Sequence, residues 1–252
     1  MKPTESANND GNEVRQAELL KNSSSVSDWY DGFADIQLEH GVNIRHRTIL
    51  RAAKAAGYRD GMRVLEIGCG IGTVTSLLAK HNSTGPILAV DISPKSIEFA
   101  KRNLARRPNV RFLVSDMSDF QHNGSFDFVV LPDVIEHIPL EQHPRLFRTI
   151  AKYMSPDGRV LINVPCAQLL EHLHIHDAKV LQVIDQPVHI DRLIGTVYAA
   201  GFALVSFASY GLQFAHAEYH SIVLRPAFIM DRLVRKSKWA LRLAELLSRI
   251  GF

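Results

Sequence analysis

The chain carries the stretch Val64-Leu-Glu-Ile-Gly-Cys-Gly-Ile-Gly72, in which a short apolar run is followed by three alternating glycines. The run predicts a buried strand, and the glycines predict a turn where a ligand can lie against the backbone. The dinucleotide fingerprint G-x-G-x-x-G, counted from Gly68, needs a glycine where Thr73 stands. A carboxylate at Glu66 would repel a pyrophosphate, whereas it would attract an ammonium or sulfonium group. The stretch therefore favours S-adenosylmethionine over NAD.

Around this stretch, apolar runs alternate with helical patterns. The predicted strands are 63–67, 87–91, 110–114, 126–131, 159–164, 202–209 and 221–224, and the helices between them include 73–80, 94–106, 141–154 and 191–200. Strands that alternate with helices predict a parallel sheet with right-handed crossovers. The last two strands follow each other without a helix, which predicts an antiparallel hairpin. The predicted fold class is α/β, with a Rossmann-like, mostly parallel sheet and helices on both faces.

The chain divides into a main body and three appended segments. Residues 1–25 are polar and predict a disordered leader, and 26–57 predict an N-terminal helical cover that contains Trp29 and Phe33. The core is predicted over 58–225, and 226–252 predict a C-terminal amphipathic helix. Within the core, 166–188 interrupt the alternation and predict a lid-like insertion. We expect a wet loop there, although the alternating His172, His174 and His176 would share one face of a strand.

Four further matches follow in order and define a resemblance. Glu66-x-Gly68-x-Gly70-x-Gly72 resembles the first motif of class I S-adenosylmethionine-dependent methyltransferases, and Asp91 and Asp116 end or follow the next two strands. The runs 126–131 and 154–158 resemble the fourth strand and the turn before the fifth. The resemblance covers about residues 44–224. It implies a seven-stranded sheet whose last strand is antiparallel, which agrees with the predicted hairpin.

The resemblance implies the cofactor site. Asp91 would bind both ribose hydroxyls and Asp116 the adenine amino group, while Tyr30 or Arg45 could bind the methionine carboxylate. A helix-capping role for Asp91 and a surface role for the other three stay open. The resemblance adds these cofactor-binding positions: Glu66, Gly68, Cys69, Gly70, Ile92, Met117 and Leu131.

The acceptor side is less well defined. Methyltransferases of nucleic-acid bases usually carry an Asn/Asp-Pro-Pro-aromatic run after the fourth strand. The corresponding residues of this chain are Leu131-Pro-Asp-Val-Ile-Glu-His137, so methylation of a nucleic-acid base is disfavoured. The Asp-x-x-Glu-His part of these residues resembles that of many small-molecule methyltransferases, including the quinone-precursor O-methyltransferases, and does not select a substrate. We expect a small-molecule acceptor with a hydroxyl oxygen and leave nitrogen and carbon open. His137 and His189 are candidate general bases, because histidine titrates near neutral pH. A packing role for either histidine is the alternative.

No metal is expected, although Asp133, Glu136 and His137 could form a divalent site. Two non-methyltransferase alternatives stay open: an NAD-dependent oxidoreductase, which Thr73 disfavours, and a catalytically silent cofactor-binding subunit.

Composition limits the compartment and the partners. The 252 residues are 46% hydrophobic and carry a net charge of +3. Two cysteines cannot form a disulfide framework, and the N-terminus lacks the apolar segment of a signal peptide, so the expected location is cytoplasmic. Residues 193–217 lack charges, but their glycines and polar residues favour a helix, a turn and a strand over a membrane span.

The basic residues concentrate in the tail. Residues 225–252 hold seven Lys or Arg against two acids, a net charge of +5, beside an apolar stripe at helical spacing. We expect this helix to pack on its own domain or on a second subunit of a homo-oligomer. An anionic membrane surface, where the protein would act on a lipid or quinone, and nucleic acid are the alternatives.

Overall fold

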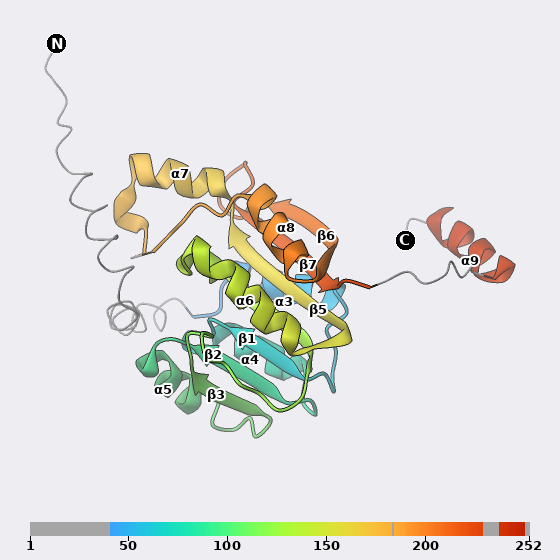
Figure 1. Ribbon diagram of the computed structural model, residues 1–252, viewed down its shortest axis with the longest axis horizontal. Coiled ribbons are helices and arrows are strands. Elements are labelled where there is room, and N and C mark those ends of the chain that lie inside the picture. The colour runs from blue at the N-terminus through green and yellow to red at the C-terminus, as the bar shows by residue number, and fades with distance from the viewer. Residues whose placement is uncertain (1–40, 183, 229–236, 250–252) are drawn as a thin grey trace, which may run out of the picture.

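The computed structural model describes residues 41–182, 184–228 and 237–249. Within them, seven strands form one sheet in the order β3-β2-β1-β4-β5-β7-β6 (Figure 1). β1 to β5 are parallel, and β7 runs antiparallel to both of its neighbours. The strand bounds are β1 Val64–Ile67, β2 Ile87–Asp91, β3 Val110–Val114, β4 Phe126–Pro132, β5 Met154–Pro165, β6 Phe202–Tyr210 and β7 Tyr219–Pro226.

The helices fill the connections between strands. Their bounds are α3 Ile44–Ala55, α4 Thr73–His81, α5 Pro94–Asn103, α6 His143–Lys152, α7 Ala167–His176, α8 Ile190–Ala199 and α9 Lys238–Arg249, with short 3₁₀ turns η1 Ile135–His137, η2 Leu140–Gln142 and η3 Ala178–Val180. Local signals set several of these bounds. Ser93 caps α5 by accepting a hydrogen bond from the Ser96 amide at 3.0 Å, and Pro94 follows at the first helical position.

Two hydrophobic cores lie on opposite faces of the sheet. On one face, Ile49 of α3 and Leu78 of α4 pack against Phe128 and Val130 of β4. On the other face, side chains of α6 and α8 pack against neighbouring strand residues, which include Val129 of β4. Burial on both faces explains why β1 and β4 are mostly apolar instead of alternating, with Glu66 and Asp127 as their two charged residues.

The order of the strands creates a switch point between β1 and β4. The chain proceeds from β1 to β2 and β3 on one side, and then returns to β4 and β5 on the other. The loops that leave the carboxyl ends of β1 and β4 therefore diverge, and such crevices bind ligands in open α/β sheets. The predicted sheet, its antiparallel strand and its covering helices are confirmed.

The structure corrects two local predictions. Residues 154–158 form the start of β5 instead of a turn, because Phe126 pairs with Met154 while Phe128 pairs with Arg159, and the extra residues bulge out. Residues 167–176 form helix α7 instead of a loop or strand. This segment is rich in Ala, Gln, Leu and Glu, so helix propensity prevails over the alternation of histidines.

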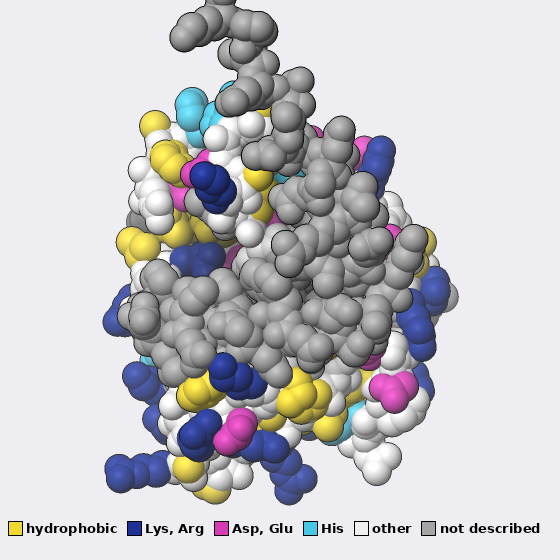
Figure 2. All heavy atoms as spheres, turned by 90° about the vertical axis from the view of Figure 1, so that its left-hand side faces the viewer, with side chains coloured by type: hydrophobic (Ala, Val, Ile, Leu, Met, Phe, Trp, Pro, Cys, Tyr) yellow, Lys and Arg dark blue, Asp and Glu magenta, His cyan; other side chains and the backbone are white. Residues whose placement is uncertain are grey.

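α7 also changes how the three histidines are arranged. The rings of His172 and His176 are 4.4 Å apart, one helical turn from each other, and His174 Nδ1 lies 2.7 Å from the Leu170 carbonyl oxygen. Histidine and hydrophobic side chains lie close together at this end of the molecule (Figure 2).

Other predicted segments fall partly outside the described residues. The leader 1–25, Trp29 and Phe33 lie there, and α3 accounts for the described part of the predicted N-terminal cover. Residues 193–217 are divided between α8, a turn at Gly201, β6 and the loop after it. In the described part of the chain, no helix is both long and apolar enough to cross a membrane.

Candidate functional site

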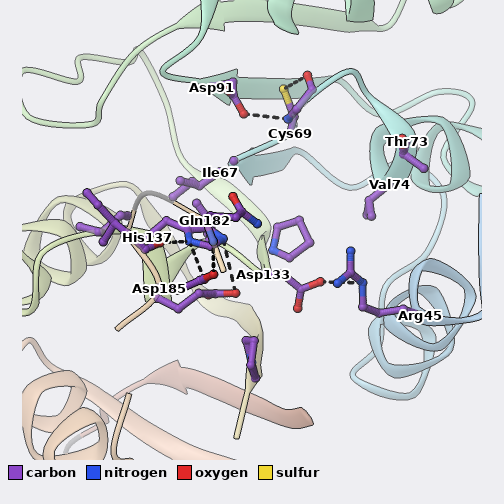
Figure 3. A pocket seen from close by; sticks show the side chains of 18 of the residues that line it. Arg45, Ile67, Cys69, Thr73, Val74, Asp91, Asp133, His137, Gln182 and Asp185 are labelled. Atoms are coloured by element: carbon purple, nitrogen blue, oxygen red, sulfur yellow. Dashed lines mark hydrogen bonds and ion pairs between the residues drawn. The ribbon is translucent and has the colours of Figure 1, made fainter. Parts of the chain in front are cut away.

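A cavity of about 840 Å³ opens at the carboxyl ends of the central strands, at the switch point between β1 and β4. The loops after β1, β2 and β3 line one half, which we call the cofactor half. The loop after β4, the segment 165–185, the start of β7 and the N-terminal end of α3 line the other, which we call the acceptor half. Figure 3 shows Asp91 and Cys69 on one side of the cavity, and His137, Asp185 and the Arg45–Asp133 pair on the other.

The glycine turn after β1 separates the two halves. Gly68, Gly70 and Gly72 all have positive φ values, of 75°, 51° and 86°, which side-chain-bearing residues rarely adopt. A Cβ on Gly68 would lie 2.4 Å from Val134 Cγ2, in the loop after β4. Glycine is therefore required at position 68 for both backbone conformation and close packing.

Glu66 is the most unusual residue of the cofactor half. It is fully buried, and among the described residues neither of its carboxylate oxygens has a hydrogen-bond partner. Burial raises its pKa to about 8; the hydroxyl and amide of the neighbouring Thr75 oppose this rise without making a well-formed hydrogen bond, and the charge of Asp91 adds to it. A buried carboxylate without partners is costly, so a cationic group in the cavity beside it would stabilise the site.

Asp91 ties the glycine turn to β2. Its Oδ2 accepts a hydrogen bond from the Gly70 amide at 2.7 Å, and its Oδ1 accepts one from the Ser93 amide at 2.9 Å. The carboxylate also lines the cavity at the carboxyl end of β2, where it can face a diol of a bound ligand. Asp91 thus has a structural contact and a position suited to a ligand.

Asp116 and Met117 line the outer part of the cofactor half. Asp116 is exposed and accepts a hydrogen bond from the Ser118 amide at 2.8 Å. Met117 has φ +66°, and Asp133, at the opposite wall, has φ +55°. These are the two non-glycine residues with positive φ in the described chain, and both line the cavity. Such backbone strain is concentrated at functional sites.

In the acceptor half, His137 is held by residues from a distant part of the chain. Its Nδ1 lies 2.5 Å from the Ile184 carbonyl oxygen and 3.2 Å from Asp185 Oδ1, and Asp185 Oδ2 accepts from the Gln182 amide at 2.6 Å. A carbonyl oxygen can only accept, so Nδ1 carries a hydrogen and Nε2 is the basic nitrogen of the neutral ring. The contacts with Ile184 and Asp185 therefore fix the tautomer and the orientation of the ring.

The electrostatic environment makes His137 more basic. Burial by itself would lower its pKa, but the carboxylates of Glu136 and Asp185 together raise the pKa to about 9. Glu136 is fully buried, its Oε1 lies 3.8 Å from His137 Nε2, and burial raises its own pKa. Strongly shifted groups in a cavity are typical of catalytic sites.

A polar network forms the wall opposite His137. Arg45 Nε lies 3.1 Å from Asp133 Oδ2, and the Arg45 side chain also donates to the Tyr219 hydroxyl at 3.3 Å. Asn163 Nδ2 donates to Asp133 Oδ1 at 2.5 Å, and the Tyr210 hydroxyl donates to Asn163 at 2.7 Å. The network joins α3, the loop after β4, β5, β6 and β7, so it fixes the position of Asp133 at the cavity.

One wall of the acceptor half is apolar. Seven aliphatic or proline side chains from the link between η1 and η2, from α7 and from the segment after α7 line this wall: Ile138, Pro139, Leu169, Leu170, Leu173, Leu181 and Ile184. This wall suits a ligand with a hydrophobic portion.

The structure brings most of the predicted site residues together. The predicted residues that line the cavity are Arg45, Glu66, Gly68, Cys69, Gly70, Asp91, Ile92, Asp116, Met117 and His137. Tyr30 lies outside the described residues. Burial raises the pKa of the Cys69 thiol, so the residue stays protonated and is unsuited to act as a nucleophile.

Two predicted residues lie elsewhere. Leu131 is fully buried in the core beside α6 and α8, because alternate residues of β4 point into the two cores. His189 precedes α8, where its Nε2 lies 3.3 Å from Glu171 Oε1, and it is not among the residues that line the cavity.

The partners of His137 and the apolar wall were not predicted from the sequence. Asp185 and Ile184 lie almost 50 positions after His137 and have no motif of their own. The leucines of α7 were not expected to line the cavity, because residues 166–188 were expected to form a loop. No group of three or more His, Cys, Asp or Glu side chains among the described residues is arranged to hold a metal ion, and Asp133 is paired with Arg45.

Comparisons with known proteins show which family this chain resembles. Residues 64–158 match the family model described as a methyltransferase domain. The chain is 27% identical over 169 residues to a ubiquinone biosynthesis O-methyltransferase of Neisseria meningitidis, covering 64% of this chain and 67% of that protein. It is 34% identical over 110 residues to phosphoethanolamine N-methyltransferase 1 of Arabidopsis thaliana, covering 43% of this chain and 22% of that protein.

A solved structure supports the same assignment of fold. The magnesium protoporphyrin IX methyltransferase of Synechocystis PCC 6803, with bound S-adenosylhomocysteine, superposes with a TM-score of 0.64 at 19% identity, over 81% of this chain and 99% of that one. Residues 64–158 thus form a methyltransferase domain, and the resemblance of the chain to class I S-adenosylmethionine-dependent methyltransferases is borne out. The predicted family and the predicted cofactor, S-adenosylmethionine, are confirmed. The chain spans about a fifth of the plant phosphoethanolamine methyltransferase it matches.

Proposed function

We propose that this protein transfers the methyl group of S-adenosylmethionine to a hydroxyl oxygen of a small molecule with a hydrophobic portion. One observation carries the proposal: a single cavity joins the partnerless carboxylate of Glu66 and the glycine turn to the oriented, basic His137. The first two features suit a cationic cofactor, and the third suits an acceptor that must lose a proton.

The residues of the cofactor half fit the cofactor. Glu66 would face its positive charge, the turn at Gly68 and Gly70 would let it approach the backbone, and Asp91 would accept from its ribose hydroxyls. Ile92, Asp116 and Met117 would surround the adenine. When bound, the cofactor supplies an electrophilic methyl group on sulfur, so the protein's main task is to position the acceptor in line with it.

His137 would act as the general base. With Nδ1 held by Ile184 and Asp185, Nε2 can accept the proton of the acceptor hydroxyl. Asp185 is then a positioning residue that also stabilises the imidazolium. The hydroxyl needs this help because a neutral oxygen is a weak nucleophile.

The apolar wall defines the acceptor further. The leucines of α7 would bury the hydrophobic portion, and the Arg45–Asp133 pair would border its polar end. Arg45 is already paired in this network, so a contact with the methionine carboxylate would have to be added to that pair. His189 has no role in this proposal.

Three alternatives concern the same site. Relatives named as both O- and N-methyltransferases keep a nitrogen acceptor open, and carbon stays open with it. A lipid or quinone acceptor would add a membrane surface as a partner. A silent subunit would bind the cofactor without turnover. The two cysteines are free thiols, in keeping with the cytoplasm as the proposed location.

The test uses the full chain, methyl-labelled S-adenosylmethionine and a metabolite extract fractionated by polarity. We expect label in a product of the less polar fractions, as a methyl ether that resists alkali. Label released by alkali as methanol would identify a carboxyl acceptor, and label retained on nitrogen would replace the hydroxyl proposal by an amine. Cofactor binding without turnover in any fraction would favour the silent subunit.

A further inference from the structure

The C-terminal helix α9 has an uncovered apolar stripe. Its large apolar residues Trp239, Leu243, Leu246 and Leu247 are 73%, 40%, 60% and 40% exposed. They are spaced by four, three and one positions, so they lie on one side of the helix. In Figure 1, α9 stands clear of the sheet and of the helices that cover it. The described part of the domain therefore does not cover this stripe. The sequence had favoured packing of the helix on its own domain or on a second subunit.

Positive charge borders the stripe. Lys238 and Arg242 are one helical turn apart and fall beside Trp239 and Leu246 on the helical wheel. The last 28 residues carry a net charge of +5, whereas the rest of the chain carries −2. The positive charge of the protein is thus concentrated around Trp239, the largest exposed apolar side chain among the described residues.

We infer that α9 binds an anionic lipid surface. The apolar stripe would lie at the boundary of the acyl chains, with Trp239 at the level of the headgroups, and Lys238 and Arg242 would contact lipid phosphates. A second copy of the chain is a poorer partner, because pairing two such tails would bring together two charges of +5. A helix of twelve residues also offers a short seam for a stable dimer.

The first experiment is co-sedimentation of the full chain with vesicles. Vesicles of equal parts phosphatidylcholine and phosphatidylglycerol should pellet the protein, vesicles of phosphatidylcholine alone should pellet far less, and added salt should release it. Failure to pellet with the mixed vesicles would overturn the inference. The readout does not involve methyl transfer, so it stands or falls separately from the proposed function.

The second experiment locates the contact. The chain has two tryptophans, so in the Trp29→Phe variant Trp239 is the sole reporter. Its fluorescence should shift to shorter wavelength when mixed vesicles are added. An emission that is already shifted without vesicles, and that returns to longer wavelength on dilution, would indicate a second copy as the partner and would contradict the inference.

Variants of α9 give the third experiment. Lys238→Gln with Arg242→Gln should weaken vesicle binding about 25-fold, since each basic residue contributes about fivefold. Trp239→Ser with Leu243→Ser should weaken it at least about tenfold without lowering the melting temperature. The matched control, Lys101→Gln with Arg106→Gln, removes two exposed charges near α5 and should bind as the natural chain does. Equal binding by all variants, or a halved mass in the Trp239/Leu243 variant, would overturn the inference.

Discussion

The two halves of the cavity are assembled in different ways. In the cofactor half, Glu66, the glycine turn and Asp91 lie within 26 consecutive positions at the ends of two adjacent strands. In the acceptor half, His137 meets Asp185, and Arg45 meets Asp133 and Tyr219, across separations of up to 174 positions. Short-range geometry thus defines the cofactor half, whereas the acceptor half depends on the tertiary fold. A substitution in the acceptor half should therefore lower the rate of methyl transfer, and a substitution in the cofactor half should weaken cofactor binding.

The largest expected effect is in the acceptor half. His137→Ala should lower kcat by about 10²- to 10⁴-fold, because it removes the proposed proton acceptor, and should leave cofactor affinity unchanged. Steady-state kinetics and calorimetry with S-adenosylhomocysteine measure the two effects. The control is His189→Ala, which removes a histidine outside the cavity and should retain activity. Equal losses in both variants would contradict the division of the cavity.

The matching change in the cofactor half is Asp91→Ala. It should weaken binding of S-adenosylmethionine by roughly 2–3 kcal/mol, or about 30- to 150-fold, since it removes charged hydrogen bonds to the ligand and loosens the glycine turn. Calorimetry gives the affinity, and NAD(H) should not bind the natural chain. If affinity is unchanged in the folded variant, Asp91 is not part of the site.

Gly68→Ala tests the point where the halves touch. The new Cβ would clash with Val134 and would hold a positive φ, so the free energy of unfolding should fall by about 1–3 kcal/mol. Adding Val134→Ala should restore part of this loss. Gly195→Ala, at a helical site with open space, should not destabilise the protein. Thermal denaturation compares the three variants.

The smallest effect concerns pH. His137 must be neutral to accept a proton, so kcat/KM should rise with pH and level off near the pKa of about 9, above the range of 6–7 expected for ordinary histidine. Asp185→Asn removes a negative charge that favours the imidazolium, and should move the curve about one unit to lower pH. An unchanged profile in this variant would separate Asp185 from the chemistry.

The difference between local geometry and tertiary contacts also explains which parts of the fold and the site could be predicted from the sequence. The strands, the helices between them and the glycine turn were predictable because apolar periodicity and capping residues such as Ser93 act locally. The contact between Asp185 and His137 was not predictable, because no sequence motif near Asp185 indicates it. Leu131 was placed in the site by its motif, but the alternation of β4 turns it into the core.

Glu66 determines how pH affects the stability of the cofactor-free protein. Glu66 keeps its proton in the folded state up to a pKa of about 8, whereas in an unfolded chain it ionises near the ordinary glutamate pKa of 4.5. Between these values the folded state binds more protons than the unfolded state, so this residue makes the cofactor-free protein less stable as pH rises. A bound cation beside Glu66 would favour its ionised form and remove the penalty. Storage without cofactor should therefore be safest at mildly acidic pH, and the cofactor should protect most under alkaline conditions.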